Sequence, residues 1–371
     1  MSSSLVRKGV VVLAVAGLLG ATVTTAEAGP PRNGALQEKL DALVGQFPAA
    51  LASVSRGGRT ESLVAGSARL GSRVPVPAGG RVRAGSNTKT FTAVVVLQLV
   101  AEGKVVLDAP IERYLPGLVP GGAAITVRQL LQHTSGLPNY TEYLGLDDIA
   151  KLRHRYFRPH ELLALALAHP AKFAPGTKWE YSNTNYVLAG LLIERVTGRP
   201  VAEQITERVI RKAGLRNTYW PEAGDRAIRG PHPRGYARSG GEVIDVTELD
   251  PSWGWAAGQL ISTPGDLAQF SRALLAGRLL PAPQLAEMRK TVEAPVLPGW
   301  RYGLGLFSVP LSCGGVYWGH GGDIHGFETR GGATDDGRSV GLAVTALPGT
   351  FGDPDQAARA VVSAVDTAFC R

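Results

Sequence analysis

A serine and a lysine stand three residues apart in Ser86-Asn87-Thr88-Lys89. In a helix, residues i and i+3 share a face, so the lysine amine would lie beside the serine hydroxyl. A serine hydroxyl needs a base to become a nucleophile, and a lysine among apolar side chains loses its proton readily enough to act as one. The pair predicts covalent catalysis through Ser86; the alternative is an N-capping serine followed by an exposed lysine.

A tyrosine and an asparagine follow in Tyr181-Ser182-Asn183. A phenol near cationic groups can be held partly ionised, so Tyr181 could take a proton from the nucleophile and return it to a leaving amine. The Asn183 amide could donate to a substrate carbonyl and hold Lys89 in place. The alternative is a pair of residues that merely completes a turn.

A third motif is His320-Gly321-Gly322-Asp323. Glycines allow a substrate backbone to approach closely, and the N–H of Asp323 could pair with that of Ser86 as an oxyanion hole. By itself, His-Gly-Gly is also typical of an ordinary turn.

Local patterns predict the elements that position these motifs. Alternating residues over 51–70 indicate a hairpin, and an apolar segment indicates a helix from Ser86 to Gly103. Thr126 with Gln129 predicts a capping box at the start of another helix. Further helices are predicted over 159–169, 186–196 and 354–369, and strands over 302–306, 317–327 and 339–344.

Strands near both ends, with helices between them, predict an α+β fold. We expect an antiparallel sheet built from both termini and flanked by helices, with a mostly helical lobe inserted in it. The sheet half would comprise 29–85 plus 256–371 and the helical half 86–255, together forming one domain over 29–371.

The composition excludes a disordered chain, because 44% of the 371 residues are hydrophobic and only 19% are charged. Arg7 and Lys8 precede an apolar run over 9–21, and Ala26-Glu27-Ala28 resembles a cleavage site. Residues 1–28 are therefore predicted to be a signal peptide cleaved near Ala28, with the remainder secreted as a monomer. No stable membrane anchor is expected, since the run is shorter than the roughly 20 residues that span a bilayer.

The formal net charge of +8 is spread along the chain, and we expect no nucleic-acid partner. Cys313 and Cys370 are the only cysteines. In an exported chain an even pair predicts one disulfide, with two free buried thiols as the alternative. No Gly-x-Ser-x-Gly or His-Glu-x-x-His motif is present, so neither a nucleophile elbow, a metal nor an organic cofactor is expected.

The order Ser-x-x-Lys, Tyr-Ser-Asn and His-x-Gly is similar to the serine β-lactamase and penicillin-binding protein superfamily. Within it, the chain most resembles the secreted actinobacterial D-alanyl-D-alanine carboxypeptidases/transpeptidases, over nearly the whole length after residue 28. The resemblance implies that Ser86 is the acylated nucleophile, and that Lys89 and Tyr181 share the acid and base work. It also implies that Asn183 and His320 shape the site and that Trp253 lines the cleft.

The resemblance further implies a DD-peptidase-like hydrolase that acts through an acyl-enzyme on D-amino acid peptides or peptidoglycan-like substrates. β-Lactams are expected to acylate Ser86, because their strained amide resembles the D-Ala-D-Ala bond. Two alternatives remain: an esterase or weak β-lactamase on the same scaffold, and a non-catalytic penicillin- or peptidoglycan-binding protein.

Three positions depart from the carboxypeptidase pattern. Where that family has an arginine and two threonines that bind the substrate's terminal carboxylate, this chain has Phe307, Gly321 and Asp323. Loss of such a charged contact costs about 2–5 kcal/mol, so we expect a substrate with a neutral or cationic group near Asp323. Arg330 could supply a replacement positive charge, but its strand parity is expected to differ from that of Asp323.

Overall fold

The computed structural model describes residues 33–371. The predicted leader and its cleavage site at Ala28 lie outside the described residues. Within 33–371, no helix combines the length and the apolar character needed to cross a membrane.

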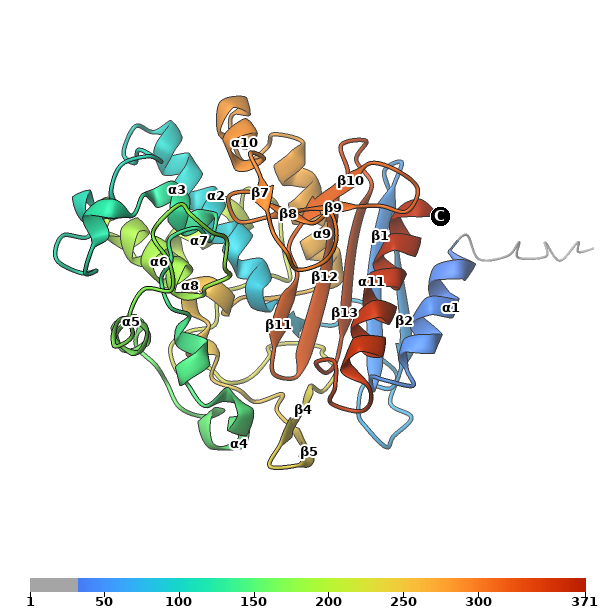
Figure 1. The fold of residues 1–371 in the computed structure, drawn as a ribbon. Helices are drawn as coiled ribbons and strands as arrows, with labels where there is room; N and C mark the ends of the chain where they lie inside the picture. Colours follow the sequence, from blue (N-terminus) through green and yellow to red (C-terminus); the bar gives the residue numbers. More distant parts are fainter. Residues whose placement is uncertain (1–32) are drawn as a thin grey trace, which may run out of the picture.

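A nine-stranded antiparallel sheet forms one half of the structure (Figure 1). Its strands, in spatial order, are β2 (Arg59–Gly66), β1 (Ala49–Arg56), β13 (Ser339–Val344), β12 (Phe327–Ala333), β10 (Val316–Gly319), β9 (Phe307–Pro310), β8 (Arg301–Tyr302) and β7 (Val292–Glu293), and β11 (Gly322–Ile324) also pairs with β12. Strands from the two ends of the chain meet where β1 pairs with β13. The predicted α+β fold, with a sheet assembled from both ends of the chain, is therefore confirmed.

Helices cover both faces of this sheet (Figure 1). The first and last helices, α1 (Gly34–Leu43) and α11 (Pro354–Cys370), pack side by side on one face, and α9 (Pro264–Leu275) packs on the other. α11 begins where the side chain of Asp353 accepts a hydrogen bond from the N–H of Gln356, with Pro354 in the first turn. Its apolar stripe is buried against the sheet, which gives the helix a fixed orientation.

The other half of the molecule is mostly helical (Figure 1). Its helices are α2 (Thr88–Ala101), α3 (Val127–Leu131), α4 (Ile149–Leu152), α5 (Pro159–Leu167), α6 (Thr184–Thr197), α7 (Val201–Ile205), α8 (Trp255–Gly258) and α10 (Ala282–Met288). Two small two-stranded sheets complete the fold, β3 (Val82–Arg83) with β6 (Ile261–Ser262) and β4 (Tyr236–Ser239) with β5 (Glu242–Asp245).

Helix α2 runs through the centre of this lobe. It is buried on all sides over 88–99, because α6, α8 and α10 pack around it, and this burial explains why its sequence is apolar all round. Phe91 stacks on Phe270 of α9 with ring centroids 3.8 Å apart, which ties the lobe to the sheet half. A 3₁₀ turn, Gly85–Asn87, precedes the helix and places Ser86 at its beginning.

Several local predictions are confirmed. The hairpin forms as β1 and β2, and the Thr126 hydroxyl accepts from the N–H of Gln129 at 3.2 Å while the Gln129 side chain accepts from the N–H of Thr126 at 2.9 Å. The prediction of one strand over 317–327 is wrong. Pairing with β12 stops at Gly319 and resumes at Gly322, so His320 and Gly321 separate two short strands, β10 and β11.

The predicted disulfide is present. Cys313, in the turn between β9 and β10, is bonded to Cys370 at the end of α11, across a sequence separation of 57. The bond fixes the C-terminal helix to the β9–β10 hairpin, whose second strand leads into the third motif.

Replacing both cysteines by serine should lower the free energy of unfolding by about 2–4 kcal/mol, because the bond removes loop entropy from the unfolded chain. Chemical denaturation of the double variant against the oxidised parent measures the difference. The reduced parent serves as the control for the substitutions themselves, and equal stability of all three would contradict the prediction.

Candidate active site

Ser86 and Lys89 meet at the beginning of α2. The Lys89 Nζ lies 3.0 Å from the Ser86 Oγ, 2.6 Å from the Asn183 Oδ1 and 2.9 Å from the carbonyl oxygen of Ala257. The lysine side chain has no solvent-exposed surface, whereas Ser86 is partly exposed in the cavity. The structure thus brings together a buried amine, an accessible hydroxyl and the amide that orients the amine.

Burial lowers the pKa of Lys89 well below its usual value, and the nearby Asp323 only partly opposes this shift. A neutral amine donates two hydrogen bonds and accepts one. The carbonyl of Ala257 and the Asn183 Oδ1 can accept only, so the amine lone pair is left for the hydroxyl proton of Ser86. This arrangement suits Lys89 to act as a general base toward Ser86.

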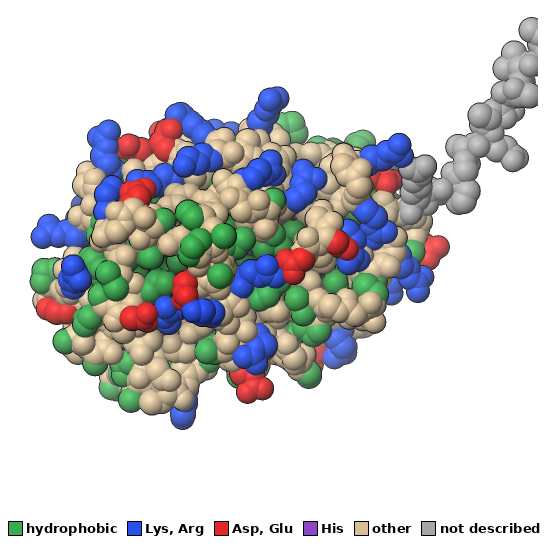
Figure 2. Space-filling view, turned by 90° about the horizontal axis from the view of Figure 1, so that it is seen from above, with side chains coloured by type: hydrophobic (Ala, Val, Ile, Leu, Met, Phe, Trp, Pro, Cys, Tyr) green, Lys and Arg blue, Asp and Glu red, His purple; other side chains and the backbone are tan. Residues whose placement is uncertain are grey.

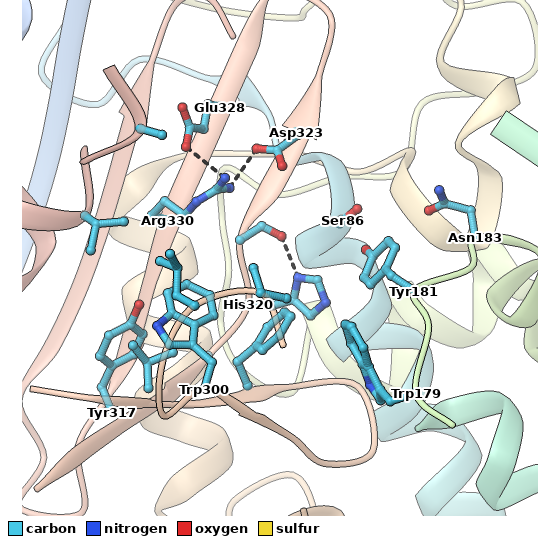
Figure 3. Close-up of a pocket in the computed structure, with 18 residues that line it drawn as sticks. Ser86, Trp179, Tyr181, Asn183, Trp300, Tyr317, His320, Asp323, Glu328 and Arg330 are labelled. Carbon is cyan, nitrogen blue, oxygen red and sulfur yellow. Dashed lines mark hydrogen bonds and ion pairs between the residues drawn. The ribbon is translucent and has the colours of Figure 1, made fainter. Parts of the chain in front are cut away.

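Tyr181 lies next to Ser86 (Figure 3). It lines the cavity together with Ser86, and its ring centroid is 4.8 Å from the Lys89 Nζ. The expectation of a partly ionised phenol is wrong, because desolvation raises the pKa of Tyr181 well above its usual value. A neutral Lys89 adds no positive charge to reverse that shift, so Tyr181 is a proton donor in the resting site.

Two glycines allow β11 to approach the beginning of α2. Gly85 has a φ of +51°, and a Cβ there would lie 2.9 Å from the backbone nitrogen of Asp323. A Cβ on Gly322 would lie 1.9 Å from the carbonyl oxygen of Ala84, so no other residue fits at that position. The close contact places the N–H of Asp323 beside the N-terminus of the helix that carries Ser86, as an oxyanion hole requires.

His320 lies in the break between β10 and β11. Its Nδ1 is 2.5 Å from the carbonyl oxygen of Gly321, and its Nε2 is 3.0 Å from the hydroxyl of Tyr302. A carbonyl can only accept, so Nδ1 carries the proton and Nε2 accepts from Tyr302. Burial lowers the pKa of His320 to about 3, so the imidazole is uncharged at neutral pH.

Sequence analysis missed His133, which packs behind Tyr181. The two rings are 4.3 Å apart, and the His133 Nδ1 accepts from the N–H of Ser182 at 3.2 Å. Its φ of +61° is unusual for a residue with a side chain. The sequence did contain a signal for this residue. A polar His-Thr-Ser-Gly segment follows the helix predicted to begin at Thr126, in a part of the chain that resembles the penicillin-binding proteins.

A cavity of about 520 Å³ opens beside Ser86. Its lining includes Tyr181, Asn183, His320, Asp323 and Phe307 among the predicted site residues, and Trp179, Val296, Leu297, Trp300, Val309, Tyr317, Glu328, Arg330, Ala358 and Val362 among those not predicted. Figure 3 shows Trp300, Tyr317 and Arg330 on one side of Ser86 and Tyr181 on the other, and hydrophobic side chains gather on the face shown in Figure 2. The cavity is therefore mostly apolar, with a few charged groups near the serine.

Trp253 does not line this cavity. It is buried in the helical lobe, where its ring is 6.0 Å from that of His325 and its carbonyl accepts a hydrogen bond from the hydroxyl of Tyr140. The expectation that Trp253 lines the cleft is therefore wrong, because the tryptophans that do so are Trp179 and Trp300.

The expectation that Arg330 and Asp323 lie on opposite faces of the sheet is also wrong. Asp323 lies directly opposite Glu328 in the β11–β12 ladder, and Arg330 is two residues further along β12, so all three share one face. The Arg330 Nη1 donates to the Asp323 Oδ1 at 2.7 Å, and its Nη2 pairs with the Glu328 Oε1 at 2.8 Å. The parity argument failed because Asp323 and Arg330 lie on two different strands, β11 and β12, and in such a pair the cross-strand register decides which residues share a face.

Within residues 33–371, no group of three or more histidine, cysteine or acidic side chains is arranged to hold a metal ion.

A serine hydroxyl near a buried amine and a phenol, with backbone N–H groups beside it, is an arrangement typical of serine hydrolases. The family model described as Beta-lactamase matches residues 36–366, and the chain belongs to this family.

Solved structures of the family superpose on nearly the whole chain. The D-stereospecific amidohydrolase from Streptomyces sp. is 42% identical with a TM-score of 0.82, covering 90% of this chain and 98% of that one. The D-amino acid amidase from Ochrobactrum anthropi SV3, complexed with L-phenylalanine amide, is 28% identical with a TM-score of 0.78, covering 91% and 99%.

Among curated proteins, the penicillin-binding protein PbpX of Bacillus subtilis (strain 168) is 27% identical over 259 residues. The match covers 69% of this chain and spans 59% of the length of that relative. The chain is thus a serine hydrolase related to penicillin-binding proteins.

The lowered pKa of Lys89 predicts the pH dependence of the reaction. Protonation removes the lone pair that accepts from Ser86, so kcat/KM for an uncharged substrate should fall as the pH drops through the lowered pKa, and should be level at pH values above it. Lys89→Arg, which keeps the charge at every pH, should lose about 10²–10⁴-fold in activity. A parent profile that still rises steeply near pH 10 would disprove the assignment.

Proposed function

We propose that the protein is a secreted D-stereospecific amidohydrolase that cleaves amide or peptide bonds of D-amino acids through an acyl-enzyme on Ser86. One observation carries the catalytic part of this proposal: the 3.0 Å contact between the Ser86 Oγ and the fully buried Nζ of Lys89. The similarity to a D-stereospecific amidohydrolase and a D-amino acid amidase supports the substrate class.

Acylation begins when Lys89 takes the hydroxyl proton of Ser86. The Ser86 Oγ then bonds to the substrate carbonyl carbon, and the negative charge on the carbonyl oxygen is stabilised by the N–H groups of Ser86 and Asp323. The C–N bond breaks as the Tyr181 hydroxyl gives its proton to the leaving nitrogen, and the ammonium of Lys89 returns a proton to the phenolate.

Deacylation reverses these proton movements with water in place of the amine. The water loses a proton to the Lys89–Tyr181 pair as its oxygen attacks the ester carbon. The bond to the Ser86 Oγ then breaks, and the serine regains its proton. An acceptor amine in place of water would give transfer rather than hydrolysis.

Intact-mass spectrometry tests the proposal directly. Incubation with a panel of D- and L-amino acid amides, peptides and esters should give an acyl adduct on Ser86 with D-configured acyl groups and release of the amine. Penicillin should give a long-lived adduct. Ser86→Ala should give no adduct, whereas Ser62→Ala, an exposed serine on β2, should behave as the parent.

Other results of this experiment would contradict the proposal, and each would support a different function. Equal adducts from D and L substrates would overturn the stereospecificity. Steady turnover of short-chain esters or a cephalosporin, with no turnover of D-amino acid amides, would favour the esterase or weak β-lactamase. Absence of any adduct or hydrolysis would leave a non-catalytic penicillin- or peptidoglycan-binding protein.

A further inference from the structure

The charged side chains of the cavity form one connected group. Asp323, Glu328 and Arg330 all line it, and Figure 3 shows the guanidinium of Arg330 between the two carboxylates. When both carboxylates are ionised, this group has two negative charges and one positive charge. The cavity beside Ser86 is then negative overall.

Each carboxylate uses one oxygen on Arg330 and retains a second. The Asp323 side chain is 56% exposed, so its Oδ2 is open to a bound molecule. Glu328 is 1% exposed, and its Oε2 is buried with no hydrogen-bond partner among residues 33–371. A buried carboxylate oxygen without a partner is costly, so a bound donor there would be stabilised.

Burial also raises the pKa of Glu328 to about 7, with Arg330 lowering it and Asp323 raising it further. A cation that enters the cavity would favour the ionised form of Glu328 and so strengthen its own binding.

The glycine at 321 makes this arrangement possible. A Cβ at Gly321 would lie 2.5 Å from the Arg330 Nη1 and 2.9 Å from its Cζ, so any side chain there would push the guanidinium away from Asp323. Gly321 and Asp323, two of the positions that depart from the carboxypeptidase pattern, therefore form one arrangement with Arg330.

The walls of the cavity suit the body of a cationic ligand. Trp300, Phe307, Val309 and Tyr317 form an apolar surface next to the charged group. Such a surface packs against carbon atoms, and aromatic faces attract a nearby ammonium. A carboxylate, in contrast, would meet a guanidinium whose two terminal nitrogens are already paired.

We propose that Asp323, Glu328 and Arg330 form a subsite for an ammonium group of the substrate, and that this subsite rejects substrates with a carboxylate at the same place. The inference rests on the proposed amidohydrolase function and names the charge class of its substrate. The ammonium could belong to the free α-amino group of the acyl part or to the amine that leaves, and the two sources are separated experimentally.

The leaving-group arm compares three N-acetyl-D-phenylalanine amides of similar size, made from ethylenediamine, propylamine and glycine. They place an ammonium, a methyl group or a carboxylate at the same distance from the scissile bond. The acyl arm compares D-phenylalanine propylamide, which has a free ammonium, with its N-formyl derivative. One of the two arms should show a preference in kcat/KM of about tenfold or more for the cation at low ionic strength, decreasing as salt is added.

Variants assign that preference to the subsite. Asp323→Asn and Glu328→Gln should each reduce the cation-to-neutral ratio of kcat/KM, and the pair together should bring it near one. Asp335→Asn is the matched control, because Asp335 also pairs with an arginine, Arg289, but does not line the cavity. Circular dichroism and Ser86 labelling by a fluorophosphonate establish that each variant is folded.

The outcomes separate this inference from the proposed function. Hydrolysis of the neutral amide with no charge preference in either arm, a preference for the carboxylate, or a preference that survives both substitutions would overturn the subsite alone. If no amide is hydrolysed, the amidohydrolase proposal fails. The same compounds can then be tested as ligands, by measuring how well each one slows the labelling of Ser86 by the fluorophosphonate. Protection by the cationic members, weakened in Asp323→Asn but not in Asp335→Asn, would still support the subsite, and equal protection by all would overturn it.

Discussion

The catalytic arrangement depends on the burial of one lysine amine. Lys89 lies where α2, α6 and α8 meet, and it reaches a hydroxyl, an amide oxygen and a backbone carbonyl without contact with water. An amine in this position is held neutral by the cost of desolvating a charge. The apolar sequence of α2 therefore has a chemical consequence besides packing, because any loosening around the helix would readmit water and return the base to its protonated form.

The close approach of β11 to the beginning of α2 adds the second requirement. Gly85 and Gly322 let two backbone segments lie in contact, which brings an N–H of the sheet beside the N-terminus of a helix from the other half of the molecule. Neither half contains a complete site. The α+β architecture, with its sheet built from both ends of the chain and helices inserted between, thus positions the nucleophile against the groups that stabilise the charge it creates.

Features set by neighbouring residues in the sequence could be predicted. The hairpin of β1 and β2, the Thr126 capping box and the beginning of α2 follow from alternation, capping chemistry and apolar periodicity. Features set by contacts between distant segments could not. The protonation state of Tyr181 depends on desolvation by the fold, and the pairing of Arg330 with Asp323 depends on the register between β11 and β12, which residue numbers alone do not give. His133 was not predicted as a site residue, because the aromatic rings in contact with it come from segments that are far apart in the sequence.

The C-terminal helix α11 packs against the sheet and also lines the cavity. On one side α11 covers the sheet, and on the other its Ala358 and Val362 form part of the wall that faces the substrate. The small size of these two side chains helps to set the width of the binding space. Natural variation at the very end of the chain can therefore widen or narrow substrate choice without touching a catalytic group, so homologues with identical motifs can differ in what they accept.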